Sequence, residues 1–511
     1  MRPIIKLFGS LLTPTAHRFA QALEEPRKAQ KIVQQGILNR LVQSDYGKSL
    51  NVQSIADWYR IPIVEYQPIE PWIEKQKETQ VSLLTSEPIL FYEKTSGSCG
   101  TAKWIPYTKS LRASFNSMFC VWAHDLIVHG SKFSTGKLYF CISPQLGEVT
   151  ANAGLEDDSE YLDGWLRWFL RPFLISPLGI NRLDDPEVFK QRLSLALLKE
   201  ENLEIISIWS PSFLKVLLDY IQEHQKQLYT QLRNQISSQR SQLLLKSEIP
   251  WREIWPHLKL ISCWDSVHSA DQATFLRSLF PGVMVQGKGL LATEAPMTIP
   301  LIEAQGCVPV LNEVFFEFED EAGKIHVLHE LEIGKVYEII LSQKGGLYRY
   351  RIGDRVRVTH FYKATPCLEF RGRTEATSDL VGEKLHTDFV RDVLTELALE
   401  ATCFKSLVPV KKPIAHYLLL LDMSQESAEA IAQKLDEALM RSYHYRQARL
   451  LGQLAPARVL VSKQIPEMMS LYRTRGGSKW GDLKHPILVT TPLDEELLTD
   501  LESVSSLPLS M

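Results

Sequence analysis

The sequence lacks the cysteine spacings of metal sites and disulfide-rich domains. Its seven cysteines are odd in number and scattered, and no two of them are spaced as Cys-x-x-Cys. This usage argues against both a zinc site and a disulfide framework. It is typical of proteins in a reducing compartment, and we therefore expect a cytoplasmic protein.

Long hydrophobic runs and a dominant sign of charge are missing as well. No uninterrupted apolar stretch approaches the roughly 18 residues that a transmembrane helix needs. Near the start, Thr13, Pro14 and His17 interrupt the apolar core that a cleaved signal peptide requires. The net charge is only −3 at pH 7. The sequence therefore predicts neither a membrane partner nor a nucleic-acid partner.

Internal repeats and low-complexity segments are also absent. The composition is instead close to that of soluble folded proteins, with 45% hydrophobic and 23% charged residues. A chain of 511 residues exceeds one ordinary hydrophobic core. We therefore predict two or more domains.

Strands and helices alternate over the first part of the chain. A short apolar run at 88–92, a helix at 111–129 and a strand at 137–142 are interpreted as a βαβ arrangement, with the intervening loop at the carboxyl end of its strand. Further strands and helices continue this alternation: 205–209, 212–244, 258–264, 270–279 and 283–286. The pattern predicts an α/β fold.

The pattern changes between Val308 and His360, where four closely spaced strands predict a β-rich subdomain. Beyond Arg373 two further helices and two strands predict an α+β module of normal small-domain size. We therefore expect a large N-terminal domain, 1–372, that combines α/β sheets with the β-rich subdomain. The second domain, 373–511, is expected to be small, mobile and α+β.

A loop rich in glycine and hydroxyl side chains follows the first expected strand. It reads Glu-Lys-Thr-Ser-Gly-Ser-Cys-Gly-Thr-Ala-Lys over residues 93–103. Glycines let backbone N–H groups approach an anion, hydroxyls add donors and Lys103 adds positive charge, so the loop suits a polyphosphate. It is not a Walker loop, because the one Gly-Lys-Ser, at 47–49, has Val42 where that pattern needs glycine. A solvated turn is the alternative interpretation.

Three further segments carry groups that suit the same ligand. Glu294, directly after Thr293, offers a carboxylate to Mg²⁺, which takes one or two protein carboxylates and keeps several waters. Asp354, directly after a glycine, can accept hydrogen bonds from ribose hydroxyls. Lys484 lies in a glycine-rich segment near the end of the chain, and a closing domain would carry it to developing negative charge.

Each of these segments also has an ordinary structural interpretation. An isolated Thr-Glu pair is typical of a protein surface. The segment Tyr348 to Asp354 also fits a charged hairpin with Arg349 and Arg351 on one strand face. A lysine in a glycine-rich segment is normally exposed to solvent.

Five features follow one another in an order that resembles the adenylate-forming enzymes. They are the loop, the Thr-Glu pair, the Tyr-Arg-x-Gly-Asp segment, the Gly372-Arg373 pair and the late lysine. More narrowly, the chain resembles the auxin-responsive Gretchen Hagen three family of acyl acid-amido synthetases, which includes the auxin- and jasmonate-conjugating enzymes of plants and has bacterial members. The most specific match is Gly-Leu-Tyr-Arg-Tyr-Arg-Ile-Gly-Asp at 346–354. Other segments at 30–46, 255–256 and 445–456 extend the resemblance over nearly the whole chain.

The resemblance implies roles for these residues. Lys484, Glu294 and Lys103 are expected to be catalytic, and Glu294 to hold Mg²⁺. Asp354 is expected to bind the ribose, and Arg373 to mark the hinge. The expected ATP-binding residues are Thr95, Ser96, Gly97, Ser98, Gly100, Thr293, Asp354 and Arg373.

Two residues depart from the family pattern. Cys99 stands where a serine or threonine is usual. Leu290 stands where an aromatic residue lies beside the adenine, which leaves adenine stacking to another residue. Lys288 and Gly289, close by, have no assigned role.

The implied reaction uses ATP and Mg²⁺ to convert a small carboxylic acid into an acyl-adenylate, and then transfers the acyl group to the amine of an amino acid. Two alternatives share every motif: an acyl-CoA ligase that forms a thioester, and a non-catalytic relative that binds a nucleotide or an acid. The sequence names neither the acid nor the amine, and the oligomeric state stays open.

Overall fold

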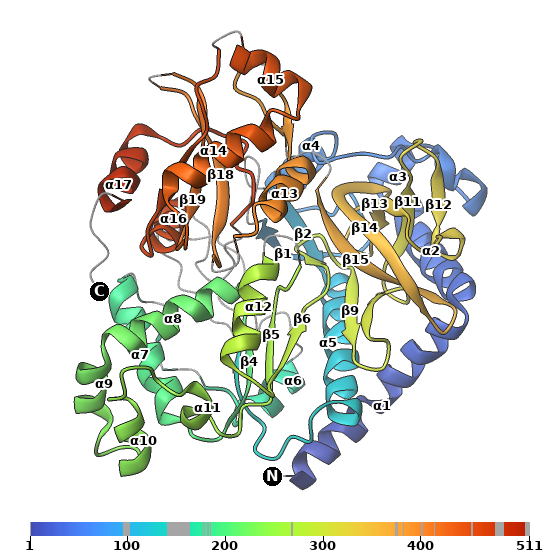
Figure 1. Ribbon diagram of the computed structural model, residues 1–511. Coiled ribbons are helices and arrows are strands. Elements are labelled where there is room, and N and C mark those ends of the chain that lie inside the picture. The colour runs from blue at the N-terminus through green and yellow to red at the C-terminus, as the bar shows by residue number, and fades with distance from the viewer. Residues whose placement is uncertain are drawn as a thin grey trace.

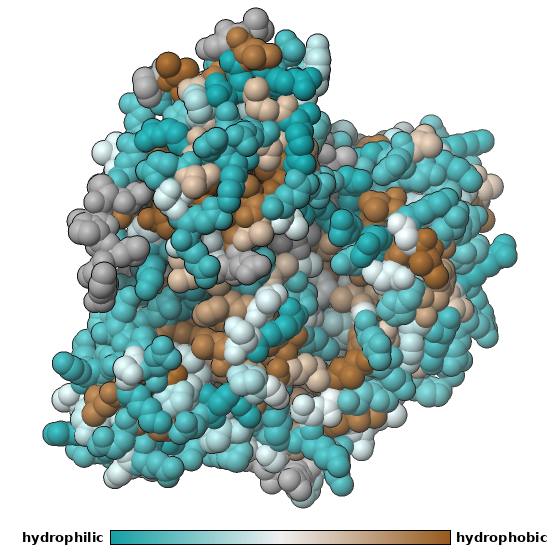
Figure 2. Space-filling model, in the orientation of Figure 1, coloured by the Kyte–Doolittle hydropathy of each residue, from teal (hydrophilic) through white to brown (hydrophobic). Residues whose placement is uncertain are grey.

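The computed structural model describes residues 2–95, 103–140, 164–175, 177, 179–180, 183, 185–266, 269–373, 377–381, 383–399, 402–412, 414–450, 453–475 and 485–505. Figure 1 shows a body built from the N-terminal and central parts of the chain, with the C-terminal elements at its upper left. Figure 2 shows that hydrophilic residues dominate this face, while hydrophobic residues gather in the recess below the C-terminal elements.

Helices α1 (Arg2–Glu24) and α5 (Lys109–His129) pack side by side along the body (Figure 1). Helix α5 begins at Thr108, whose side chain accepts a hydrogen bond from the Leu111 amide, as expected for an N-cap. Helices α2 (Pro26–Gln43) and α3 (Asp45–Ser49) follow α1 and are separated at Ser44. Two short helical segments follow: η1 (Ile55–Arg60) and α4 (Glu70–Thr79).

A parallel sheet forms one part of the body, as the alternating pattern predicts. Its described strands run in the order β3 (Lys137–Phe140), β4 (Leu203–Ser207), β5 (Leu260–Cys263) and β6 (Met284–Gly287). Helices with apolar residues in the same core are α7 (Pro186–Lys199), α8 (Pro211–Glu223), α9 (Gln225–Leu232), α10 (Ser238–Leu243), α11 (Trp251–Ile254) and α12 (Ala270–Leu279). Helix α6 (Gly164–Leu170) packs instead with α1 and α5.

The β-rich subdomain is also present. Its described strands form an antiparallel sheet in the order β12 (Ile325–Val327), β11 (Phe315–Glu319), β13 (Val336–Ser342), β14 (Tyr350–Tyr362) and β15 (Thr365–Arg373). Strand β15 was not predicted. Shorter elements flank the sheet: β7 (Leu291–Ala292), β8 (Ala295–Pro296), β9 (Thr298–Leu301), β10 (Gly306–Pro309) and η5 (Leu328–Glu330).

The predicted βαβ arrangement around the glycine-rich loop is wrong. Strand β1 (Ile89–Lys94) pairs antiparallel with β2 (Trp104–Thr108), and β3 belongs to a different sheet. The loop therefore connects the two strands of a hairpin. A short apolar run is compatible with either arrangement, because its own periodicity does not show which strand it pairs with.

The C-terminal elements have cores of their own. Strand β18 (Lys405–Val410) pairs antiparallel with β19 (His416–Leu421), which pairs parallel with β20 (Arg458–Val461). Five helices pack on this sheet or beside it: α13 (Thr387–Glu396), α14 (Ala428–Leu439), α15 (Tyr443–Leu450), α16 (Ile465–Arg475) and α17 (Glu495–Ser505). Two short strands, β16 (Thr377–Ser378) and β17 (Leu385–His386), precede α13. No helix in the described part of the chain is both long enough and apolar enough to span a bilayer.

Candidate functional site

The neck of the glycine-rich loop is closed by hydrogen bonds between Thr95 and Lys103. The Thr95 amide donates to the Lys103 carbonyl at 2.9 Å, and the Lys103 amide donates to the Thr95 hydroxyl at 3.1 Å. The Lys103 Nζ lies 5.7 Å from the centre of the Tyr66 ring, and the Tyr66 hydroxyl accepts from the Trp104 amide at 2.8 Å. The β1–β2 hairpin thus holds both ends of the loop and fixes the start of the Lys103 side chain.

The Thr293-Glu294 pair forms the turn between β7 and β8. This turn is tied to the loop hairpin, because the Tyr107 hydroxyl on β2 donates to the Thr293 carbonyl at 2.7 Å. Tyr107 is fully buried, so the contact is shielded from water. Two segments almost 200 residues apart in sequence are in this way held in a common site.

Glu294 is buried among charged groups of the site. It is 5% exposed. Burial raises the pKa of the Glu294 carboxyl above its usual value, and the Asp354 carboxylate adds to this effect, whereas the positive charges of Arg373 and Lys103 oppose it. A buried carboxylate that is surrounded in this way favours a cation or a bound proton.

Asp354 and Arg373 face each other across the β14–β15 pair. Arg373 Nε donates to Asp354 Oδ1 at 2.7 Å, and Asp354 is 5% exposed. The β13–β14 register shifts just before this point, and Gly353 has a φ of 83°. Few side chains tolerate that backbone conformation, which accounts for the glycine in Tyr-Arg-x-Gly-Asp.

The alternative of a charged hairpin with Arg349 and Arg351 on one strand face is not what the structure shows. Arg349 precedes β14, has a φ of 44° and is 5% exposed. Its guanidinium binds Glu317 with two hydrogen bonds of 2.9 Å and donates to the Ile61 carbonyl at 2.8 Å. Arg351 instead pairs with Glu319 at 2.6 Å in a half-buried position. Arg349 therefore anchors the segment that leads to Asp354.

We expect Arg349→Ala to lower the free energy of unfolding by about 3–5 kcal/mol, because it leaves the buried Glu317 carboxylate without its partner. The control Arg357→Ala removes a pair with Glu369 whose side chains are 42% and 40% exposed, and it is expected to cost about 1 kcal/mol or less. Urea denaturation followed by tryptophan fluorescence measures both values. Equal costs for the two variants would contradict the anchoring role of Arg349.

The structure brings together several of the predicted site residues. Lys103, Glu294, Asp354 and Arg373 lie within electrostatic range of one another, and Thr293 belongs to the same turn as Glu294. Other predicted residues lie outside the described part of the chain: Ser96, Gly97, Ser98, Gly100 and Lys484.

Three tyrosines at the site were missed from the sequence: Tyr66, Tyr107 and Tyr350. Tyr107 and Tyr66 connect separate segments by hydrogen bonds. Tyr350 is fully buried, and its hydroxyl lies in range of the Glu294 and Arg373 charges. Buried tyrosines are common in cores, and only Tyr350, within the Tyr-Arg-x-Gly-Asp segment, carried a sequence signal.

Leu290 is 7% exposed and belongs to the core next to the antiparallel sheet. Lys288 lies beyond the end of β6, where its Nζ donates to the Ser207 hydroxyl at 2.8 Å and lies 4.8 Å from the centre of the Trp209 ring. These contacts place Lys288 at the carboxyl end of the parallel sheet.

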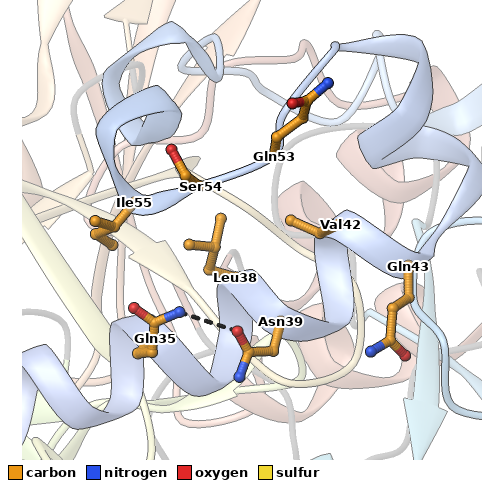
Figure 3. A pocket seen from close by; sticks show the side chains of 8 residues that line it. All are labelled: Gln35, Leu38, Asn39, Val42, Gln43, Gln53, Ser54 and Ile55. Carbon is orange, nitrogen blue, oxygen red and sulfur yellow. Dashed lines mark hydrogen bonds between the residues drawn. The ribbon is translucent and has the colours of Figure 1, made fainter.

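A surface cavity of about 440 Å³ lies away from these residues, between α2 and the segment 53–55 (Figure 3). Its lining consists of amide, hydroxyl and aliphatic side chains, and Gln35 Nε2 donates to Asn39 Oδ1 at 2.9 Å. It has no ionisable side chain among its lining residues and shares none with the predicted site. It is therefore not a candidate for the chemistry.

The residues present fit a magnesium ion that is shared with a substrate. No group of three or more histidine, cysteine, aspartate or glutamate side chains within the described residues is arranged to enclose a metal. Mg²⁺ commonly binds one or two protein carboxylates and completes its octahedron with waters and substrate phosphates. The buried Glu294 carboxylate is suited to that arrangement.

Family models match most of the chain. They are the GH3 family N-terminal domain over residues 15–250, the central domain over 307–373 and the C-terminal domain over 386–492. The chain is 24% identical to indole-3-acetic acid-amido synthetase GH3.15 of Arabidopsis thaliana, a match that covers 93% of this chain and 92% of that protein. It is 22% identical to jasmonoyl-L-amino acid synthetase JAR4 of Nicotiana attenuata, over 75% and 76% of the two chains.

Solved structures show the same fold. The GH3.15 acyl acid amido synthetase matches with a TM-score of 0.79 at 21% identity and covers 96% of both chains. A 2-hydroxyisobutyryl-CoA ligase in the postadenylation state matches with a TM-score of 0.52 at 14% identity, over 94% of this chain and 92% of that one. The predicted family, the predicted α/β fold and the predicted ligase class are confirmed. The chain belongs to the GH3 family of acyl acid amido synthetases.

Proposed function

We propose that this protein uses MgATP to activate a small carboxylic acid as an acyl-adenylate and then transfers the acyl group to the amino group of an amino acid. The observation that carries the proposal is the gathering of Lys103, Glu294, Asp354 and Arg373 from separate elements of a GH3-family fold. Two cations and two carboxylates at one site suit a nucleotide and its metal ion.

In the first step, a carboxylate oxygen of the acid attacks the α-phosphorus of ATP. The bond from this phosphorus to the bridging oxygen breaks, and pyrophosphate leaves. When bound, Mg²⁺ supplies positive charge to the phosphates. The loop between Thr95 and Lys103 would contribute amide donors, Lys103 and Lys484 would contribute charge, and Glu294 would hold the metal ion. Asp354 would accept hydrogen bonds from the ribose.

The paired state of Asp354 is consistent with this role. Arg373 donates a hydrogen bond to Asp354 Oδ1, and an ionised carboxylate has further acceptor sites for ribose hydroxyls. Arg373 also fixes the carboxylate in one orientation. The Asp354–Arg373 pair would thus present the acceptor ready for the nucleotide.

In the second step, the amine attacks the acyl carbonyl, AMP leaves with the oxygen it received from the acid, and the nitrogen loses a proton. The acyl-adenylate has to be shielded from water during this step, and closure of a domain from residue 373 onward would provide the shielding. We propose that rotation near Arg373 removes Lys484 and admits the amine.

Ion pairs join the C-terminal elements to the body in the present arrangement. Lys190 Nζ on α7 lies 2.7 Å from the Glu467 carboxylate on α16, and Lys405 on β18 lies 2.9 Å from Asp271 on α12. Lys190 is 4% exposed, whereas the Glu467 side chain is 36% exposed. A rotation of the C-terminal elements would have to exchange these contacts for others.

Pyrophosphate release from MgATP tests the proposed function. The purified protein is supplied with a panel of aromatic and aliphatic acids, under three acceptor conditions: none, mixed amino acids, and coenzyme A. Release that requires an acid and is accelerated by amino acids, with an amide product by mass spectrometry, is the expected result. Acceleration by coenzyme A with a thioester product would show that the protein is an acyl-CoA ligase and not an amide-forming enzyme. ATP binding without pyrophosphate release under any condition would favour a non-catalytic relative.

A further inference from the structure

The Tyr350 hydroxyl is a buried donor without an acceptor in the described part of the chain. Tyr350 begins β14 and is 0% exposed. Its backbone is fixed from both sides, because it pairs with Leu341 on β13 and bridges to Val64. Its Oη has no hydrogen-bond partner among the described residues. Burial of a hydroxyl without a partner costs stability, and proteins rarely keep such a group without a reason.

The neighbouring tyrosines differ from Tyr350 in this respect. The Tyr348 hydroxyl, two residues away, donates to the Leu84 carbonyl at 2.8 Å. The Tyr66 hydroxyl accepts from the Trp104 amide, and the Tyr107 hydroxyl donates to the Thr293 carbonyl. The three partnered hydroxyls connect segments of the fold. The absence of a partner is therefore specific to Tyr350 within this group.

The surroundings of Tyr350 are those of the nucleotide site. Its hydroxyl interacts electrostatically with the Glu294 carboxylate and the Arg373 guanidinium. The same Glu294 interacts with Lys103, at the end of the glycine-rich loop, and Arg373 pairs with Asp354. An unpartnered donor thus lies among the groups proposed to hold the metal ion, the phosphates and the ribose.

We propose that the Tyr350 hydroxyl donates a hydrogen bond to a phosphate oxygen of the bound nucleotide. This inference rests on the proposed function. The hydroxyl needs an acceptor, and the nucleotide brings negatively charged phosphate oxygens into a site that already contains Lys103 and Arg373. Hydrogen bonds to charged acceptors are stronger than neutral ones, and they gain further in a buried site.

The hydroxyl is well suited to act as a donor. Burial raises the pKa of Tyr350, and the Glu294 carboxylate raises it further, so the proton stays on the oxygen at physiological pH. The ring is part of the core beside the antiparallel sheet, which fixes the position of the oxygen without any other bond. Such a preorganised donor loses little entropy when the nucleotide binds.

The test compares Tyr350→Phe with the matched control Tyr348→Phe, using calorimetry with adenosine, AMP and MgATP. Tyr350→Phe is expected to weaken AMP and MgATP binding by about tenfold, as the loss of a hydrogen bond to a charged group implies, and to leave adenosine binding unchanged. Because no partner is lost in the free protein, its melting temperature is expected to stay the same or rise. Tyr348→Phe is expected to lower the melting temperature, because it strands the Leu84 carbonyl, and to leave all three affinities unchanged.

Other results would overturn the proposal. Unchanged affinity of Tyr350→Phe for AMP and MgATP would remove the hydroxyl from the phosphate site, and an equal loss for adenosine would assign it to the nucleoside instead. These affinities are measured without catalytic turnover. A wild-type protein that binds nucleotide but releases no pyrophosphate would therefore refute the proposed reaction without refuting the contact to Tyr350.

Discussion

Replacing Glu294 with glutamine is expected to slow acyl-adenylate formation by at least about a hundredfold, because the substitution removes the negative charge that would hold the metal ion beside the phosphates. The folded protein should tolerate the change. Glutamine has nearly the same shape, and the buried position already disfavours the ionised carboxyl, as the raised pKa of Glu294 indicates. Pyrophosphate release under saturating MgATP measures the rate.

The pH dependence of stability provides a second measurement on the same variant. A carboxyl whose pKa is raised by folding binds its proton more tightly in the folded state than in the unfolded state. Its contribution to stability is therefore present at low pH and is lost as the pH rises through the folded-state pKa. Without a bound metal ion, Glu294→Gln should become more stable relative to the wild type as the pH increases through this range.

Glu248→Gln, at an exposed carboxylate far from the site in sequence, is the matched control and should leave the rate of pyrophosphate release unchanged. Full pyrophosphate release by Glu294→Gln would show that the carboxylate has no part in the reaction. A loss of activity together with a lower melting temperature would point to misfolding as the cause.

Lys484→Ala is expected to slow acyl-adenylate formation by about 10²- to 10³-fold, the usual effect of removing one group that stabilises charge in a transition state. Amide formation from a preformed acyl-adenylate should stay within about twofold of the wild type, because the lysine would leave the site before that step. Rapid-mixing experiments that start from ATP or from synthetic acyl-adenylate separate the two steps.

Lys479→Ala is the control, because Lys479 belongs to the same glycine-rich segment of the sequence. It should affect neither step by more than about twofold. An equal loss in both steps for Lys484→Ala would contradict the proposed rotation. The contacts of Lys190 with Glu467 and of Lys405 with Asp271 would then describe a fixed interface.

Local patterns predicted much of the fold. The helix expected at 270–279 is α12 with the same bounds, because its apolar residues recur at helical spacing and its neighbours are short strands. The pairing of separate strands was harder to predict from the sequence. The run at 88–92 was assigned to a βαβ unit, although its partner is β2, whose Trp-Ile-Pro-Tyr-Thr sequence contains a proline that weakens the strand signal.

Site residues that belong to a sequence motif could be predicted. Site residues that are defined by tertiary contacts could not. Glu294 and Asp354 lie in motifs, and the structure places them within electrostatic range of each other. From the sequence, Arg349 was considered only as part of a charged hairpin, because its partner Glu317 lies 32 residues away and nothing local marks it as buried. The unpartnered hydroxyl of Tyr350 is likewise a property of the fold alone.

The path of one oxygen atom tests the central claim, the acyl-adenylate, most directly. The protein is incubated with MgATP, an amino acid and an accepted acid labelled with ¹⁸O in both carboxylate oxygens, and the products are analysed by mass spectrometry. If the acid attacks the α-phosphorus and AMP later leaves with that oxygen, the AMP carries one ¹⁸O atom and the amide retains the other. Formation of the amide with unlabelled AMP, or with the label in inorganic phosphate, would contradict the account, because the acid would then have been activated at another phosphorus.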